Sequence, residues 1–285
     1  PSCKVVCGAL ELHPFVSASL HSFMTASATV RPPQIGTGGQ VSERHLESNV
    51  LLRTLEPSAK ARFTARLHKF ELVRGQVLHN LGDSVEWVHF PRHGLIAVMA
   101  ETVAGESVES GMVGREGALG IFEACGSGQL FTRAVVQVGG EALRMSATSY
   151  RELFVESAAL RTAVHKYVEF LIMEARQFVL CNALHTVESR LCRSILDALE
   201  RSGLDRALPV TQESLAQMLG AQRTTIAACV SKLYREGVIK GGRGSLEILD
   251  RPGLERLACC CRETLRYARG ELQVSEEKSC EEEPS

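Results

Sequence analysis

Residues 222–236 place polar, basic and small side chains on one side of a pattern with helical spacing. An arginine at the start of such a helix can pair its guanidinium with the O6 and N7 atoms of guanine. A surface of small and polar groups is what the major groove of DNA accepts. The chemistry indicated here is recognition of double-stranded DNA. The candidate residues are Gln222, Arg223, Thr224, Thr225, Ala228, Ser231 and Arg235.

These side chains need a second helix to hold them, and the sequence supplies one just before. Thr211 is a suitable N-cap for a helix over residues 212–219, and Gly220 can form the turn that follows. Apolar residues on both segments could form one small core, while Ala216 allows the helices to cross closely. The pattern predicts a helix-turn-helix whose second helix enters the groove. The predicted core residues are Leu215, Leu219, Ile226, Val230 and Leu233.

The stretch "VIKGGRGSLEIL" predicts a strand, a glycine-rich turn and a second strand, with Arg243 at the tip. This hairpin would be the wing, and Arg243 would follow phosphates, which adds affinity but little sequence information. The 285-residue chain has a net charge of -1, but residues 206–251 carry seven basic and four acidic residues. Because helical hairpins also occur in proteins that do not bind DNA, the wing and this local charge are what favour DNA binding.

Upstream of this unit, the residue composition and pattern of the sequence change twice. Residues 1–45 are poor in charge and rich in Ser, Thr, Ala and Gly, which predicts a disordered extension. A short helix is expected over residues 47–67, interrupted at residues 56–57. Between residues 70 and 145, six short β-branched and aromatic runs predict an antiparallel sandwich or barrel. An α+β domain with fewer strands is the alternative, since half of these runs lack clean alternation.

Residues 150–201 contain neither Gly nor Pro and predict a helix. Five apolar residues spaced 4, 3, 4 and 3 form a seam of the kind that packs one helix against another. The seam predicts a homodimer, and a central helix within a monomer is the alternative. A last helix is expected over residues 252–272, followed by an acidic, disordered tail. The seam residues are Val164, Val168, Leu171, Ala175 and Phe178.

Ten cysteines are present without any CxxC pair, which favours a reducing, cytoplasmic compartment over a disulfide scaffold. Cys259, Cys260 and Cys261 fall within the expected last helix, where neighbouring side chains point about 100° apart. They could not all bind one ion there, so no metal site is assigned. No apolar run reaches the length of a membrane span. Pro1 is not an initiator methionine, so the printed start is expected to be trimmed or incomplete.

Enzyme motifs are missing from the sequence: it has no HExxH, GxSxG or P-loop pattern, and its nine histidines are dispersed. We therefore expect a binding protein rather than an enzyme. The rival to DNA binding is a cyclic-nucleotide-like sensor or protein-interaction module whose helical hairpin only packs.

A β-rich domain, a long apolar helix and a winged helix-turn-helix, in this order, resemble the Crp/Fnr family of bacterial transcription regulators. The resemblance covers about residues 48–255 and is strongest in "VTQESLAQMLGAQRTTIAACVSKLYREGVIKGGRGSLEIL". It implies an α+β fold with an N-terminal antiparallel β-roll, a long central dimerisation helix and a C-terminal winged helix-turn-helix. It also implies a homodimer that controls transcription at a two-fold symmetric DNA site, with RNA polymerase as a further partner.

The resemblance divides the chain into five parts and assigns roles at the DNA. Thr211 would contact phosphate and Arg223 would take the base-reading arginine position. Thr224 stands where many members carry a base-reading acid, and Ala228 where many carry a second arginine, so the operator sequence is expected to differ. The parts are an extension at 1–45, a sensor-like β-roll at 46–150, a dimerisation helix region at 151–202, the winged helix-turn-helix at 203–255 and a C-terminal helix with the acidic tail at 256–285.

Relatives that bind cyclic nucleotides hold the ribose with a Glu in a Gly-Glu-Leu-Gly-like turn and the phosphate with an Arg. Here the turn reads "GALGIF", so Gly117, Ala118 and Leu119, with Arg133 further on, mark the candidate effector pocket. The methyl group of Ala118 cannot accept a hydrogen bond from a ribose hydroxyl, which leaves the effector unknown and cyclic AMP disfavoured. Glu116 could substitute only if the turn shifted in register.

Another branch of the family carries an iron–sulfur cluster on an N-terminal cysteine group with one further Cys. Cys3, Cys7 and Cys125 are too few for ligation by four thiolates. No cofactor is therefore expected.

Overall fold

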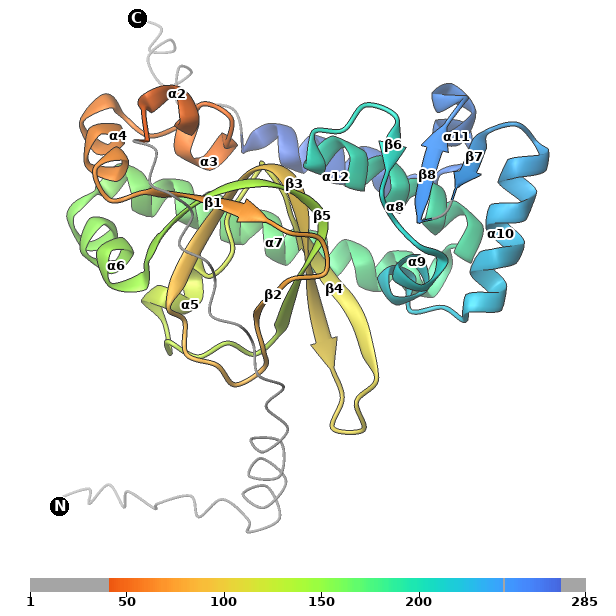
Figure 1. Ribbon diagram of the computed structural model, residues 1–285, viewed down its shortest axis with the longest axis horizontal. Helices are drawn as coiled ribbons and strands as arrows, with labels where there is room; N and C mark the ends of the chain where they lie inside the picture. The colour runs from red at the N-terminus through yellow and green to blue at the C-terminus, as the bar shows by residue number, and fades with distance from the viewer. Residues whose placement is uncertain (1–40, 243, 273–285) are drawn as a thin grey trace, which may run out of the picture. The chain divides into compact units, whose positions relative to one another are not determined.

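The computed structural model describes residues 41–242 and 244–272 (Figure 1). Three regions for which the sequence carried predictions lie outside these residues: the extension up to residue 40, Arg243 at the wing tip, and the acidic tail from residue 273. Among the described residues, the first helix begins at Glu43, where Ser42 and His45 form a capping box. Residues 43–45 of the extension predicted as disordered are therefore helical. The first helices are α2 (Glu43–Leu46), α3 (Val50–Arg53) and α4 (Pro57–Thr64).

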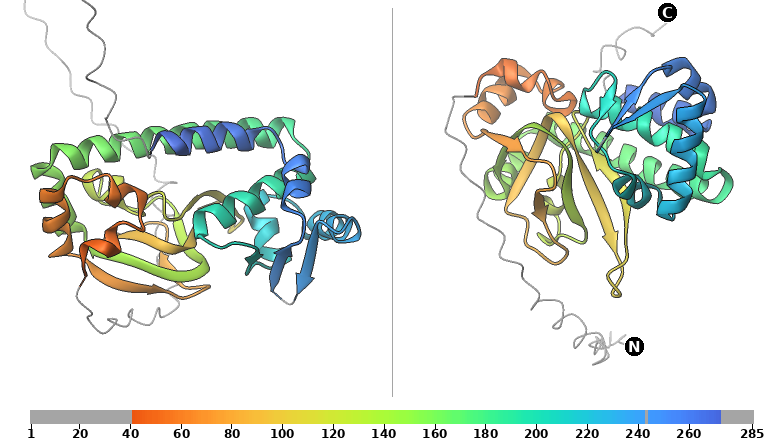
Figure 2. Two further views of the ribbon diagram at one scale, coloured as in Figure 1. Left: turned by 90° about the horizontal axis from the view of Figure 1, so that it is seen from above. Right: turned by 45° about the vertical axis from the view of Figure 1, so that its right-hand side comes forward.

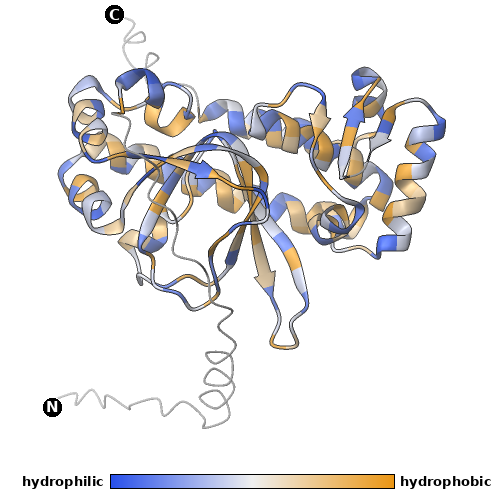
Figure 3. Cartoon of the chain, viewed as in Figure 1, coloured by the Kyte–Doolittle hydropathy of each residue, from blue (hydrophilic) through white to orange (hydrophobic). Residues whose placement is uncertain are grey.

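An antiparallel five-stranded sheet follows within the described residues, in the order β1-β5-β3-β4 with β2 paired to β5. The β-rich domain predicted from the sequence is confirmed, although six predicted runs become five strands. Hydrophobic residues run along these strands and along the helices packed on them (Figure 3). The strands are β1 (His68–Leu72), β2 (Val77–His79), β3 (Trp87–Glu101), β4 (Ser107–Val113) and β5 (Arg133–Ser146), and helix α5 (Ile121–Cys125) lies between β4 and β5.

The stretch "PRHG" has the composition of a turn, and its proline and glycine predict a break between two strands. That prediction is wrong, because β3 continues through it with register shifts against β5 from Pro91 to Ile96. Gly94 adopts φ +90°, and a Cβ there would lie 2.7 Å from the carbonyl oxygen of Val138. Gly140 likewise lies against His93. These glycines allow two long, bulged strands to approach closely rather than ending them.

The region predicted as one helix over residues 150–201 consists of three. Ser157 accepts a hydrogen bond from the Leu160 N–H at 3.1 Å, and Thr186 accepts one from the Ser189 N–H at 3.3 Å. Each side chain caps the start of a new helix, so the single helix predicted from the sequence is wrong. The helices are α6 (Ala147–Glu156), α7 (Ala158–Leu184) and α8 (Val187–Ser202).

Within the described residues, the C-terminal part holds a three-stranded sheet, in the order β6-β8-β7, and four helices. Its residues share one hydrophobic core with α8 and with Leu95, Met112 and Val138 of the roll. The helix α12 lies alongside α7 (Figure 2). These elements are β6 (Ala207–Leu208), α9 (Gln212–Leu219), α10 (Arg223–Arg235), β7 (Ile239–Gly242), β8 (Ser245–Ile248), α11 (Arg251–Leu257) and α12 (Cys261–Glu271).

Among the described residues, no helix combines the length and the apolarity that a lipid bilayer requires.

Candidate nucleic-acid interface

Thr211 begins the supporting helix α9 as predicted. Its hydroxyl oxygen accepts the Ser214 N–H at 3.0 Å, and its own N–H donates to the Ser214 hydroxyl at 2.9 Å. This reciprocal pair satisfies two backbone donors that a helix start leaves without partners. Thr211 remains exposed, so the start of α9 is accessible to a phosphate.

Gly220 forms the turn between α9 and α10 in the left-handed conformation, with φ 56° and ψ 40°. A Cβ at this position would also lie 3.1 Å from the Val108 side chain of β4. Four of the five predicted core residues are buried between the helices, and Val230 is partly buried beside them. The helix-turn-helix and its core are therefore confirmed. The buried four are Leu215, Leu219, Ile226 and Leu233.

The outward face of α10 is free of tertiary cover. Gln222 is its N-cap, and the Arg223 side chain is 71% exposed, with only Glu213 nearby at 3.9 Å. An exposed ion pair of this kind is worth at most about 1 kcal/mol, so it would not hold Arg223 back from a base. All seven candidate base-facing residues of this segment are exposed: Gln222, Arg223, Thr224, Thr225, Ala228, Ser231 and Arg235.

The predicted wing is the hairpin β7–β8, whose residues pair antiparallel from Ile239↔Ile248 to Gly242↔Ser245. A hollow lies between this hairpin, the start of α9 and the start of α10. Thr211, Glu213, Arg223 and Gly242 are among the residues that line it. The hollow brings the predicted phosphate-binding and base-reading residues together on one face of the molecule.

The helix-turn-helix is held from behind by α8 and by the roll. Lys232 of α10 donates to both carboxylate oxygens of Glu188 at 2.8 and 3.0 Å, and Arg190 donates to the Leu219 carbonyl. On the wing side, Arg74 from the β1–β2 turn donates to the Gly244 carbonyl at 3.2 Å. These contacts fix the domain while leaving the α10 face open.

The "GALGIF" turn of the roll is committed to internal packing. Gly117 lies so close to Tyr167 of α7 that an added Cβ would fall about 2 Å from the ring. Ala118 is 2% exposed within the roll core, and Leu119 exchanges backbone hydrogen bonds with His89. Arg133 lies elsewhere: it pairs with Glu101 at 3.5 Å and lines a different hollow beside α9.

Glu116, the acid nearest that turn, is already paired. Its carboxylate accepts from the Arg201 Nε at 2.8 Å and from the Gly114 N–H at 2.9 Å. Arg201 also donates to Glu174 of α7 at 2.6 Å, and all three side chains are almost fully buried. Glu116 therefore connects the roll to the end of α8 through one of its two carboxylate oxygens. Glu174 directly follows the apolar run 170–173 of α7, and this is the sequence signal that could have indicated the triad.

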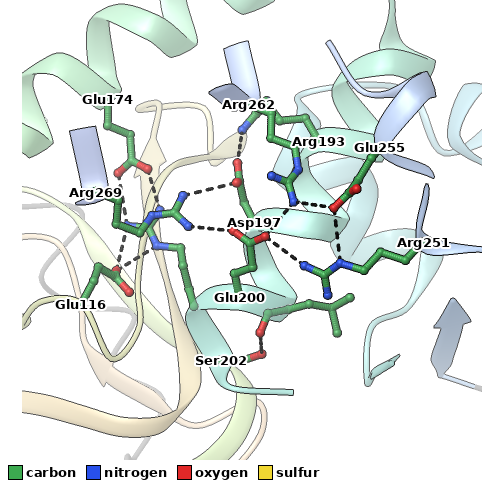
Figure 4. A network of polar contacts seen from close by, with 12 residues as sticks. Glu116, Glu174, Arg193, Asp197, Glu200, Ser202, Arg251, Glu255, Arg262 and Arg269 are labelled. Atoms are coloured by element: carbon green, nitrogen blue, oxygen red, sulfur yellow. Dashed lines mark hydrogen bonds and ion pairs between the residues drawn. The ribbon is translucent and has the colours of Figure 1, made fainter. Parts of the chain in front are cut away.

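A larger network of charges joins α8 to α11 and α12 (Figure 4). Asp197 pairs with Arg193 at 2.9 Å and with Arg269 at 3.3 Å. Glu200 pairs with arginines on both C-terminal helices, Arg251 and Arg262. The network fastens the C-terminal helices to α8, the helix that leads into the helix-turn-helix. Sequence reasoning missed it because its partners lie up to 72 residues apart.

The predicted dimer seam is only partly free. Val164 is buried in the core of its own roll, and Val168 and Leu171 pack against that core. Phe178 lies under the Arg193 guanidinium, 4.9 Å from ring to charge, while Ala175 is exposed. The apolar residues of α7 that remain exposed are Ile172 at 48%, Val179 at 72%, Leu180 at 42% and Leu184 at 72%.

The prediction that the three consecutive cysteines lie within one helix is wrong. Helix α11 ends at Leu257, the Cys259 N–H donates to the Ser189 carbonyl of α8 at 3.2 Å, and α12 starts at Cys261. This break brings Cys259 and Cys261 together with Cys181 and His185 from the end of α7. Cys260 and Cys125 are exposed, whereas Cys3 and Cys7 lie outside the described residues.

Comparisons with known proteins agree with this architecture. Residues 189–257 match the family described as the Crp-like helix-turn-helix domain. The transcriptional regulator SdrP of Thermus thermophilus is 39% identical over 51 residues, which span 18% of this chain and 25% of that protein. This chain thus aligns with only a quarter of that relative's length.

Solved structures extend the likeness to the fold. FixK2 of Bradyrhizobium japonicum is 13% identical with a TM-score of 0.58, and the match covers 68% of this chain and 98% of FixK2. A Crp/Fnr-family regulator of Eubacterium rectale is 18% identical with a TM-score of 0.58, covering 74% of this chain and 98% of that one. Residues 189–257 are therefore a Crp-like helix-turn-helix domain, and the chain has the fold of the Crp/Fnr transcription regulators.

Proposed function

We propose that this protein is a sequence-specific DNA-binding transcription regulator that acts as a homodimer. The observation that carries the proposal is the uncovered polar face of α10, set beside the capped start of α9 and the wing hairpin. In a helix-turn-helix this is the face that enters the major groove. Such a protein acts where chromosomal DNA is, in the cytoplasm, and RNA polymerase is its expected further partner.

Four of the candidate residues have a specific role in this proposal. Arg223 reads a guanine through its two parallel donors, and Thr211 holds a phosphate at the start of α9. Arg243, which lies outside the described residues, is also assigned to a phosphate. The second base-reading arginine that many members of the family carry is absent here. Its position is taken by Ala228, which offers only a methyl group. An alanine there can contact the methyl group of thymine, so a thymine in the corresponding half-site position is expected.

The exposed apolar residues of α7 support the homodimer. Ile172, Ala175 and Val179 follow each other at spacings of three and four, which places them on one side of the helix. Leucine and valine side chains more than two-fifths exposed along one helix are costly to leave in water, and a second copy of α7 would cover them. Compared with the predicted seam, this interface is shifted away from Val164 toward the uncovered side.

The roll would act as an effector-sensing or degenerate sensor domain. Its turn at Gly117 and Ala118 is packed against α7, and Glu116, the acid nearest the turn, is buried and bound to Arg201. Any effector other than cyclic AMP would therefore act elsewhere on the roll or on the helices around it.

The proposal is tested by selecting bound duplexes from a randomised DNA library with the purified full chain. We expect an inverted repeat whose half-sites lie about one helical turn apart, or a multiple of it. Recovery of duplexes without any shared motif would contradict the proposal. That result would favour the alternative function, a sensor or interaction module whose helical hairpin only packs.

A further inference from the structure

Three sulfur atoms and one imidazole nitrogen converge where α7 ends. Cys181 lies on the last turn of α7, and His185 is the C-cap residue of that helix. Cys259 lies in the connection between α11 and α12, and Cys261 is the first residue of α12. The donor atoms of these four residues all lie within 4.8 Å of one another.

Two of the six separations among these donor atoms are close to the edges of a tetrahedron around a metal ion, and all six lie within 4.8 Å. The Cys181 and Cys259 Sγ atoms are 3.5 Å apart, and the Cys261 Sγ is 3.4 Å from the His185 Nδ1. Zinc binds sulfur at about 2.3 Å and nitrogen at about 2.0–2.1 Å, which gives edges of about 3.8 Å between sulfurs and about 3.6 Å between sulfur and nitrogen. The observed Cys181–Cys259 and Cys261–His185 distances are shorter than these edges by a few tenths of an ångström.

The four ligands stand on elements that are fixed independently of any ion. The His185 N–H donates to the Cys181 carbonyl at 3.1 Å, which sets the two α7 ligands four residues apart on one side of the helix. The Cys259 N–H is bound to Ser189 at 3.2 Å. A site held by rigid elements is pre-organised for binding.

Two neighbouring side chains, Gln177 and Arg193, surround these four residues. Gln177 donates from its Nε2 to the Cys261 sulfur at 3.0 Å. Arg193 lies within the electrostatic influence of both Cys181 and Cys259, and is itself anchored to Asp197. Three thiolates and one Zn²⁺ leave a net charge of -1, which the Arg193 guanidinium would offset.

A simple disulfide explains less of this arrangement. Cys181 and Cys259 are free cysteines, and joining them would use two donors and leave His185 and Cys261 without a purpose. Buried cysteines also pack as small apolar residues, but that role does not require an imidazole nitrogen among them.

We propose that Cys181, His185, Cys259 and Cys261 bind one Zn²⁺ ion as a closed Cys3His site. Soft thiolate ligands with one imidazole select zinc over hard cations, and four protein ligands leave no open position for catalysis. The ion would join the end of α7 to α12 at the point where the chain turns into α8. Because α8 leads into the helix-turn-helix, the site would fix the angle between the central helix and the DNA-facing domain.

The test begins with the full chain purified under reducing conditions and without chelators. Elemental analysis should find about one zinc per chain, and replacement with Co²⁺ should give the visible absorption of tetrahedral cobalt with thiolate charge transfer. Cys181→Ser and Cys261→Ser should each lower the metal content at least tenfold. Cys260→Ser is the matched control: Cys260 is exposed between two proposed ligands, and its Sγ lies 3.7 Å from His185 Nε2 but is not one of the four converging donors, so this variant should keep the metal.

Three outcomes would overturn the proposal. The first is reduced wild-type protein that holds no zinc and shows no tetrahedral cobalt spectrum; this readout does not depend on whether a variant folds. The second is a Cys181–Cys259 disulfide found by mass spectrometry in freshly purified protein. The third is loss of metal from Cys260→Ser equal to the loss from Cys181→Ser, which would mean a different ligand set.

Discussion

Replacing Arg201 with methionine should destabilise the fold more than any surface charge change. Arg201 is 1% exposed and is the cation shared by Glu116 and Glu174, each 3% exposed. Removing one partner of a buried ion pair leaves an uncompensated charge and costs about 3–5 kcal/mol of unfolding free energy. For a domain of this size that corresponds to a fall of about 10 °C in melting temperature.

The same variant should show a characteristic pH dependence. Burial already raises the pKa of Glu174, and Arg201 is the main influence that lowers it. Without Arg201, the pKa of Glu174 in the folded state rises further above its value in the unfolded chain. The loss of unfolding free energy is therefore largest at high pH and shrinks as the pH falls toward the unfolded pKa. Adding Glu174→Gln to the variant should recover part of the loss, because it removes one of the two stranded charges.

Urea unfolding at about pH 8 and pH 5 measures both effects. Arg251→Met is the control: its side chain is 43% exposed and pairs with Glu200, so its loss should stay below about 1 kcal/mol. If Arg201→Met costs no more than this control at pH 8, the buried triad does not hold the roll to α8 and the reasoning fails.

Three further outcomes are expected. Burial, with Arg144 and His79 nearby, lowers the pKa of His89 from 6.5 to about 3, so stability is lost as pH falls below 6.5; by pH 5 this group accounts for about 2 kcal/mol. In urea unfolding, His89→Gln should lose about 2 kcal/mol less unfolding free energy than the wild type between about pH 7.5 and pH 5. An unchanged loss would contradict the assignment. Val179→Glu should give monomers by light scattering, and a persistent dimer would exclude this face of α7. Calorimetric titration with cyclic AMP should show no saturable heat, whereas micromolar binding would mean that Ala118 does not block the ribose.

The order of the domains and the faces of the two DNA-facing helices could be predicted because each rests on local patterns. The Thr211 cap, the Gly220 turn and the apolar spacing from Leu215 to Leu233 act within about twenty residues. Local patterns of this kind can be recognised in a single sequence. The exposed α10 face follows from the same periodicity.

Features that depend on distant contacts could not be predicted. Helix α11 ends without Gly or Pro because Cys259 bonds to Ser189, and this break is what assembles the cysteine and histidine cluster. The long helix breaks at Ser157 and at Thr186, where a capping hydroxyl is a weaker signal than a proline. Gly94 and Gly140 lie inside β3 and β5, where they allow close strand approach, and only the tertiary structure reveals this role.

The central claim, that α10 reads DNA bases, is tested most directly by the affinity of Arg223→Ala for a full set of single-base variants of the selected operator. We predict a loss of preference at one base pair per half-site, worth about 1–3 kcal/mol, with the other positions unchanged. Arg256→Ala is the matched control, since its side chain is 73% exposed and pairs loosely with Asp250, much as Arg223 pairs with Glu213. Arg256 lies on α11, outside the proposed face, so its variant should keep wild-type preferences. If Arg223→Ala retains the wild-type base preference at every position, α10 is not the reading helix and the account is contradicted.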